Sequence, residues 1–125
     1  MSTEEKLKTT DLRDAIVEMI LEKKGEDIAV IDLNGVTTMS DYFIIATGNS
    51  NVHVKAIADG INIQLKNEHK ALPWHVEGMG SQKWILLDYV DIVVHIFDEK
   101  MRKFYALEKL WEDAKIVHIK DELTS

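Results

Sequence analysis

One stretch, WILLDYVDIVVHIF at residues 84–97, predicts the centre of the fold. Its two apolar runs, 84–87 and 92–97, are rich in β-branched and aromatic residues and flank a short acidic segment, as in two strands joined by a tight turn. Side chains alternate between the faces of a strand, so Trp84 and Leu86 share one face. Because both faces are apolar, we expect the hairpin to lie in a sheet that is covered on both sides, or covered by a partner.

The length of 125 residues predicts one domain, with residues 1–9 and 115–125 as peripheral tails. The absence of cysteine excludes disulfides, thiol catalysis and thiolate metal sites. No apolar run is long enough to span a membrane, and the polar start resembles neither a signal peptide nor a transit peptide. We therefore expect a cytoplasmic protein that makes no membrane contact.

The formal net charge of -7 argues against a protein whose main task is to bind phosphate backbones. Complementary charge raises the rate at which proteins meet, so an acidic domain is better suited to a basic protein. We expect a basic protein partner and little direct contact with nucleic acid.

Hydrophobic periodicity predicts the other elements. Helices are expected at residues 10–24 and 52–69, and a last helix follows Asp98. One stripe of that last helix would hold Met101, Phe104, Leu107, Trp111 and Ala114. Further strands are expected at residues 28–33, 42–47 and 71–76, the last at a sheet edge because it contains Pro73. The order predicts an α/β fold with a mixed five-stranded sheet flanked by helices, while the tail 115–125 either adds a strand or stays free.

The acidic pair Asp88 and Asp91 is the first candidate for chemistry. Nucleotidyltransferases hold a divalent metal between two carboxylates that project from one face of a strand, whereas a spacing of three places these two on opposite faces. Asp side chains also cap turns by accepting hydrogen bonds from nearby backbone amides, which explains the pair without a metal.

Two further motifs have simple structural explanations. Gly48-Asn49-Ser50 resembles a phosphate cradle at a helix start, but it lacks both the P-loop lysine pattern and a dinucleotide fingerprint, so a glycine turn followed by an N-cap is the better interpretation. The five histidines lack the four-residue helical spacing of a zincin, and a packed sheet explains His95 better than metal ligation does. We expect no cofactor, no metal and no catalytic residue.

The aromatic residues predict both core and interface. We expect Phe104 and Trp111 to be core residues of the last helix. Trp84 begins a strand beside a glycine-containing turn and Tyr89 lies at a turn tip, so these two are the better candidates for exposure at an interface.

Together these stretches resemble the Iojap family, the ribosomal silencing factors. The resemblance spans residues 12–111, with matching stretches in the family's order. They are Asp41 to Ser50, Val54 to Ala58, Val76 to Gly78, Trp84 to Phe97, and Arg102 to Trp111.

The resemblance implies a nucleotidyltransferase-like fold without the catalytic carboxylates, and a protein that is not an enzyme. Family members bind the large ribosomal subunit through the universal ribosomal protein fourteen, block joining of the small subunit and repress translation. By matching positions, the partner-binding residues would be Glu77, Trp84, Asp88, Tyr89 and Asp91.

Position 90 departs from the family, which usually has Gly where this chain has Val90. Because a β-branched residue resists positive φ, we expect a type I or wider turn with negative φ at Val90. Two alternatives to silencing stay open. They are a factor for large-subunit assembly that uses the same surface, and an active nucleotidyltransferase-like enzyme that uses Gly48, Ser50 and the acidic pair. Separately, the apolar hairpin suggests that the free protein forms a homodimer that hides Trp84 when the ribosome is absent.

Overall fold

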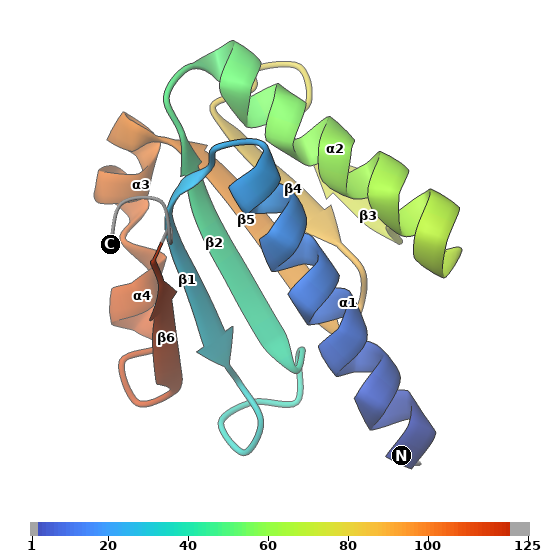
Figure 1. Ribbon diagram of the computed structural model, residues 1–125. Coiled ribbons are helices and arrows are strands. Elements are labelled where there is room, and N and C mark those ends of the chain that lie inside the picture. Colours follow the sequence, from blue (N-terminus) through green and yellow to red (C-terminus); the bar gives the residue numbers. More distant parts are fainter. Residues whose placement is uncertain (1–2, 121–125) are drawn as a thin grey trace.

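The computed structural model describes residues 3–120, which form one twisted six-stranded sheet with helices on both faces (Figure 1). The elements are α1 (Thr3–Glu22), β1 (Glu26–Asp32), β2 (Tyr42–Gly48), α2 (Asn51–His69), β3 (His75–Glu77), β4 (Trp84–Asp88), β5 (Ile92–Asp98), α3 (Glu99–Tyr105), α4 (Leu107–Leu110) and β6 (Lys115–Ile119). The strand order is β3-β4-β5-β2-β1-β6. The predicted mixed α/β fold is confirmed, and the central hairpin is β4–β5.

The sheet is mixed because β2 and β5 pair in parallel while all other neighbours are antiparallel. The two strands occupy the middle of the sheet, and their near-continuous apolar sequences agree with burial on both faces. The strand expected at residues 71–76 is shorter in the structure, His75–Glu77, and Pro73 precedes it. It lies at one edge of the sheet, as predicted.

The predicted count of five strands is wrong, since the structure has six. The additional strand is β6, which pairs with the outer edge of β1. Of the two alternatives for the tail 115–125, the structure therefore has the added strand, over Lys115–Ile119, and residues 121–125 lie outside the described part. This pairing gives hydrogen-bond partners to backbone N–H and C=O groups on the outer edge of β1. Ile116 of β6 also packs against buried core residues such as Phe43.

The first helix begins at Thr3, well before the expected residue 10. Most of the segment 1–9, expected as a tail, is therefore helical, and residues 1–2 lie outside the described part. Glutamate and lysine are strong helix formers, and acids near a helix start favour the dipole, so polarity alone is a poor sign of fraying.

Two apolar clusters form the core, one on each face of the sheet. Helices α1 and α2 cover the larger one (Figure 1), which contains Ile16, Ile20, Ile57 and Ile61 from the helices and Ile44, Ile85, Leu87 and Ile96 from the sheet. The smaller cluster comprises Ile31, Leu33, Phe43, Ile45 and Phe97, against which residues of α3 and α4 pack. On this second face the helices cover only part of the sheet, and Trp84 and Leu86 are half-buried.

The predicted last helix is two helices. Ala106 lies between them with φ of 44°, in the left-handed region that ends a helix. Arg102 holds the corner, since its guanidinium donates to the Glu108 carboxylate at 2.9 Å and to the Thr47 hydroxyl at 2.9 Å. The break moves Phe104 off the predicted stripe, and its side chain is 77% exposed, so its assignment to the core is wrong. Trp111 does pack against the smaller cluster.

In the described part of the chain, every helix is too short or too polar to cross a membrane.

Candidate functional site

An open groove of about 700 Å³ lies on the sheet face opposite α1 and α2. Its lining is mainly apolar and comes from the loop before β2, β2 itself, the segment before β3, the hairpin β4–β5, and α4 with the residue that follows it. The lining residues are Met39, Ser40, Phe43, Trp74, Trp84, Leu86, Asp88, Val90, Val93, His95, Leu107, Leu110 and Trp111. Because side chains alternate along a strand, Trp84, Leu86 and Asp88 of β4 lie on the same sheet face as Val93 and His95 of β5. All five line the groove.

Trp84 is held in one orientation by its neighbours. Its indole nitrogen donates to Nδ1 of His95 at 3.2 Å, and its ring stacks on Phe97 with centroids 4.8 Å apart. Tyr105 packs against it with a centroid distance of 4.5 Å. A large aromatic ring with a fixed orientation at the wall of an open groove is typical of a binding hot spot.

His95 lies in the groove floor with only 5% of its surface exposed. Burial lowers its pKa to about 4, so the imidazole is neutral at neutral pH. Since Nδ1 accepts the bond from Trp84, Nε2 carries the proton, and no acceptor for it exists among residues 3–120. The Phe43 ring packs edge-on against the imidazole at 4.9 Å between centroids.

The turn between β4 and β5 closes one end of the groove. The Asp91 amide donates to the Tyr89 carbonyl at 3.0 Å across Val90, whose φ is 75°, which defines a γ-turn of the rare positive-φ type. The expected negative φ at Val90 is therefore wrong.

Surrounding contacts hold this strained turn in place. The Val90 amide donates to Asp88 Oδ1 at 2.8 Å, and the Ser40 hydroxyl donates to the Val90 carbonyl at 3.2 Å. The Asp91 carbonyl accepts from the amides of Asp41 and Tyr42. Such contacts keep a β-branched residue in a conformation that costs about 1–3 kcal/mol. The bond at Asp88 also confirms that this carboxylate caps the turn.

The five residues implied by the family resemblance are in different environments. Trp84 and Asp88 line the groove, and Glu77 pairs in register with Leu86, which places it on the same sheet face. Asp91 is exposed in the turn. Tyr89 packs against the larger cluster, and its hydroxyl donates to Asn62 Oδ1 of α2 at 2.5 Å, on the other side of the sheet. Burial raises the pKa of Tyr89.

Sequence reasoning missed several exposed groove residues. Trp74 is 76% exposed and Leu110 is 72% exposed, and both line the groove. Trp74 follows the proline that marks the edge strand, and its amide donates to the Asp88 carbonyl at 2.7 Å. Leu110 lies one helical turn after Leu107, and this spacing indicates that both leucines lie on the same face of the helix.

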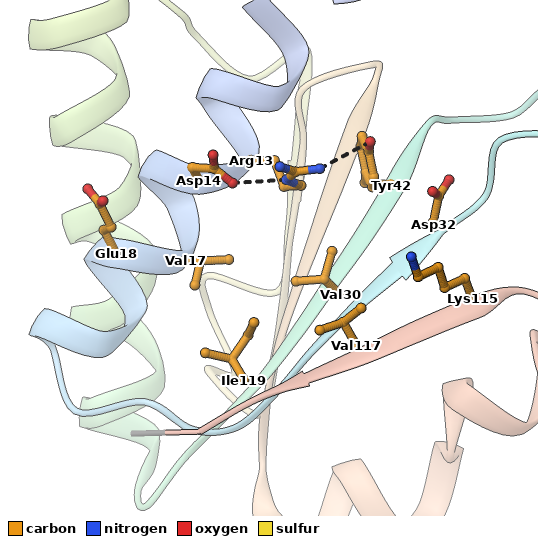
Figure 2. A pocket seen from close by; sticks show the side chains of 10 residues that line it. All are labelled: Arg13, Asp14, Val17, Glu18, Val30, Asp32, Tyr42, Lys115, Val117 and Ile119. Carbon is orange, nitrogen blue, oxygen red and sulfur yellow. Dashed lines mark hydrogen bonds and ion pairs between the residues drawn. The ribbon is translucent and has the colours of Figure 1, made fainter. Parts of the chain in front are cut away.

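A second cavity, of about 480 Å³, lies between α1 and β6 (Figure 2). Figure 2 shows Arg13 between Asp14 and Tyr42, donating to both, above a floor of valine and isoleucine side chains. None of the five implied residues lines it, and its rim carries both cations and acids without a prevailing sign.

The remaining candidates have structural roles. Ser50 is the N-cap of α2 and accepts from the His53 amide at 3.1 Å, which confirms the N-cap interpretation of Gly48-Asn49-Ser50. No group of three or more potential metal ligands occurs within residues 3–120.

An α/β domain whose sheet exposes an apolar groove with carboxylates at its edge has the features of a protein-binding module. The family model described as "ribosomal silencing factor during starvation" matches residues 6–125. The chain belongs to this family of ribosomal silencing factors.

Individual relatives agree with this assignment. The ribosomal silencing factor of Bacillus subtilis is 40% identical over 98 residues, which are 78% of this chain and 82% of the relative. A crystal structure of a protein from Chromobacterium violaceum superposes with a TM-score of 0.79 at 34% identity and covers 82% of this chain and 85% of that one. The mouse protein named "mitochondrial assembly of ribosomal large subunit protein 1" is 29% identical over 100 residues, and the match covers 44% of its length.

Proposed function

We propose that this protein binds the large ribosomal subunit in the cytoplasm through the groove, prevents the small subunit from joining, and so represses translation. The family membership supports a regulatory role at the ribosome. The observation that carries the proposal is the groove itself. It is apolar, open, and bordered by a fixed tryptophan.

The proposed partner is a basic ribosomal protein, the universal ribosomal protein fourteen. Glu77, Asp88 and Asp91 lie at or beside the groove, and their carboxylates complement a basic partner. In this proposal Trp84 is the apolar anchor, and Tyr89 contributes by tying the turn to α2. The buried centre supplies affinity, while the acids steer the approach.

The test is co-sedimentation with purified large subunits, using a matched pair of substitutions. Leu110→Lys places a cation in the groove, and Val52→Lys places one on α2, where Val52 is 77% exposed against 72% for Leu110. We expect binding to weaken about thirtyfold for Leu110→Lys and also for Trp84→Ala, the scale of a hot-spot loss of about 2 kcal/mol. Val52→Lys is expected to bind like the wild type. Equal binding by the wild type and all three variants would show that the binding site lies outside the groove.

Silencing itself has a separate readout. Protein added to mature subunits is expected to lower formation of joined ribosomes in proportion to groove occupancy. Full joining in the presence of saturating bound protein would contradict silencing.

A role in assembly of the large subunit is the second candidate, favoured by the name of the mouse relative. It predicts that cells lacking the protein accumulate incomplete large subunits during growth in rich medium. Silencing predicts normal subunits there and excess translation during starvation.

We also propose that free protein forms a homodimer through the groove, because an uncovered apolar surface with a large tryptophan favours self-association. Light scattering at concentrations on the order of tens of micromolar is expected to show a dimer for the wild type and a monomer for Leu110→Lys. A monomer for the wild type would exclude the homodimer, and it would not contradict the proposed binding to the ribosome.

A further inference from the structure

Beside the groove, Phe104 and Tyr105 form an exposed aromatic pair at the end of α3. Phe104 is 77% exposed and Tyr105 is 44% exposed, and the rings meet edge to face with centroids 5.1 Å apart. The break at Ala106 places them at the surface. An exposed aromatic pair disfavours solubility unless a ligand or partner covers it.

Lysines surround this pair. Lys83 and Lys100 line one recess of about 410 Å³ together with both aromatic residues. The Lys83 carbonyl accepts from the Asp98 amide at 2.8 Å, which holds the loop before β4 against the start of α3. Lys103 follows Lys100 by three residues on α3, so both project from the same side of the helix.

Nearby charges of opposite sign do not cancel the three lysines. The Asp98 carboxylate, which also lines the recess, accepts from the Met101 amide at 2.8 Å as the N-cap of α3. Glu99 is exposed on the same helix and, like Lys103, does not line the recess, so the three lysines exceed the two carboxylates by one charge. Arg102 points inward to Thr47 and Glu108. In a chain with a net charge of -7, this is a local concentration of cations.

We propose that Lys83, Lys100, Lys103, Phe104 and Tyr105, here called the α3 patch, bind single-stranded RNA exposed on the ribosomal subunit. Bases stack on exposed aromatic rings without a sequence requirement, and lysines neutralise the phosphates between them. The patch is continuous with the groove, because Tyr105 packs on Trp84. If the partner protein in the groove belongs to an RNA–protein particle, RNA of that particle therefore lies close to the α3 patch. The inference rests on the proposed function, since it assumes that the particle is the ribosomal subunit.

Site-specific photocrosslinking tests the inference. The full chain carries Phe104→p-benzoylphenylalanine in one version, Leu110→p-benzoylphenylalanine in a second, and the same change at Ile63 of α2, which is 60% exposed, in a third. Each is bound to intact large subunits and irradiated. We expect a nuclease-sensitive RNA adduct from position 104, a protein adduct from position 110, and no adduct from position 63.

Each other outcome is informative. A protein adduct from position 104, or no adduct there while position 110 reacts, overturns the RNA contact and keeps the proposed function. Loss of adducts at both positions overturns the proposed function together with the inference.

Salt dependence provides a second measurement. The triple substitution of Lys83, Lys100 and Lys103 by Gln is compared with the same substitution of Lys24, Lys66 and Lys70, exposed lysines away from the patch. Both triples lower the net charge by the same amount, so only position differs. We expect the patch triple to reduce the slope of log affinity against log salt for subunit binding by about 2, at about 0.7 per phosphate. Equal slopes for the two triples overturn the inference, as does binding of wild type to phosphatidylserine vesicles but not to subunits.

Discussion

The indole nitrogen of Trp84 donates to Nδ1 of His95 at 3.2 Å, across the hairpin that forms the groove. The bond fixes the imidazole tautomer and the direction of the indole at once. It also occupies the only polar atom of the Trp84 side chain, so a partner would contact this side chain through the face and edges of its ring. Nδ1 can accept this bond only while the His95 imidazole is neutral, so the orientation of Trp84 in the groove wall depends on that neutral state.

Stability is expected to fall as the pH falls through the range in which His95 would be protonated in the unfolded chain. Its pKa is about 4 in the fold, against 6.5 for an ordinary histidine, so protons bind the unfolded state preferentially between these values. The stabilisation is complete above pH 6.5, and about 2 kcal/mol is lost between pH 7.5 and 5.

Denaturant unfolding at a series of pH values measures this loss. His95→Gln is expected to be less stable at pH 7.5 but to lose less stability toward pH 5. The exposed His75→Gln is expected to keep the wild-type loss. Parallel curves for wild type and His95→Gln would contradict the assignment.

Val90→Gly is expected to stabilise the protein by about 1 kcal/mol, because glycine adopts positive φ without strain and the relief exceeds its larger unfolded-state entropy. The comparison is Val52→Gly in the first turn of α2, which is expected to destabilise by a similar amount. Thermal melts of the two variants give both values. A loss of stability for Val90→Gly would show that packing of the valine outweighs the strain.

Tyr89→Phe is expected to cost about 1 kcal/mol of stability, since it removes the bond to Asn62 and leaves that amide oxygen without its donor. Binding to the large subunit is expected to change little, because the hydroxyl points to α2 on the far side of the sheet. Unfolding and co-sedimentation of one preparation separate the two effects. A large loss of binding at unchanged stability would assign Tyr89 a direct contact.

Glu77→Gln combined with Asp91→Asn is expected to slow association with the large subunit and to weaken its salt dependence, while dissociation stays nearly constant. Glu22→Gln with Glu26→Gln removes the same charge from exposed positions at the end of α1 and the start of β1, and serves as the control. Stopped-flow association at several salt concentrations measures this. Identical rates for the two double variants would argue against electrostatic steering by the groove acids.

The sequence predicts those features that depend on local pattern. The alternation in β4 and β5 defines the hairpin, and the Ser50 cap marks the start of α2. The apolar run of β2 identifies a central strand. These signals are strong because burial on a sheet face or along a helix stripe imposes a short repeat on the sequence.

The remaining features depend on contacts between distant segments. The positive φ of Val90 is maintained by Ser40, fifty residues earlier, and the corner at Ala106 by the bond from Arg102 to Thr47. Strand β6 has only half-buried isoleucines, so its pattern does not separate an edge strand from a free segment. The groove also escapes sequence analysis, because an apolar residue facing solvent has the same pattern as one in a core.

The parallel pairing of β2 with β5 gives the molecule a particular route to its native state. Each antiparallel hairpin closes a short loop, whereas the central pair joins segments separated by the whole of α2, β3 and β4. Closing a loop of that size costs conformational entropy, and this cost arises before the favourable contacts between β2 and β5 form. We therefore expect the hairpin β1–β2 and the meander β3–β4–β5 to form early, and their docking along β2 and β5 to limit the folding rate.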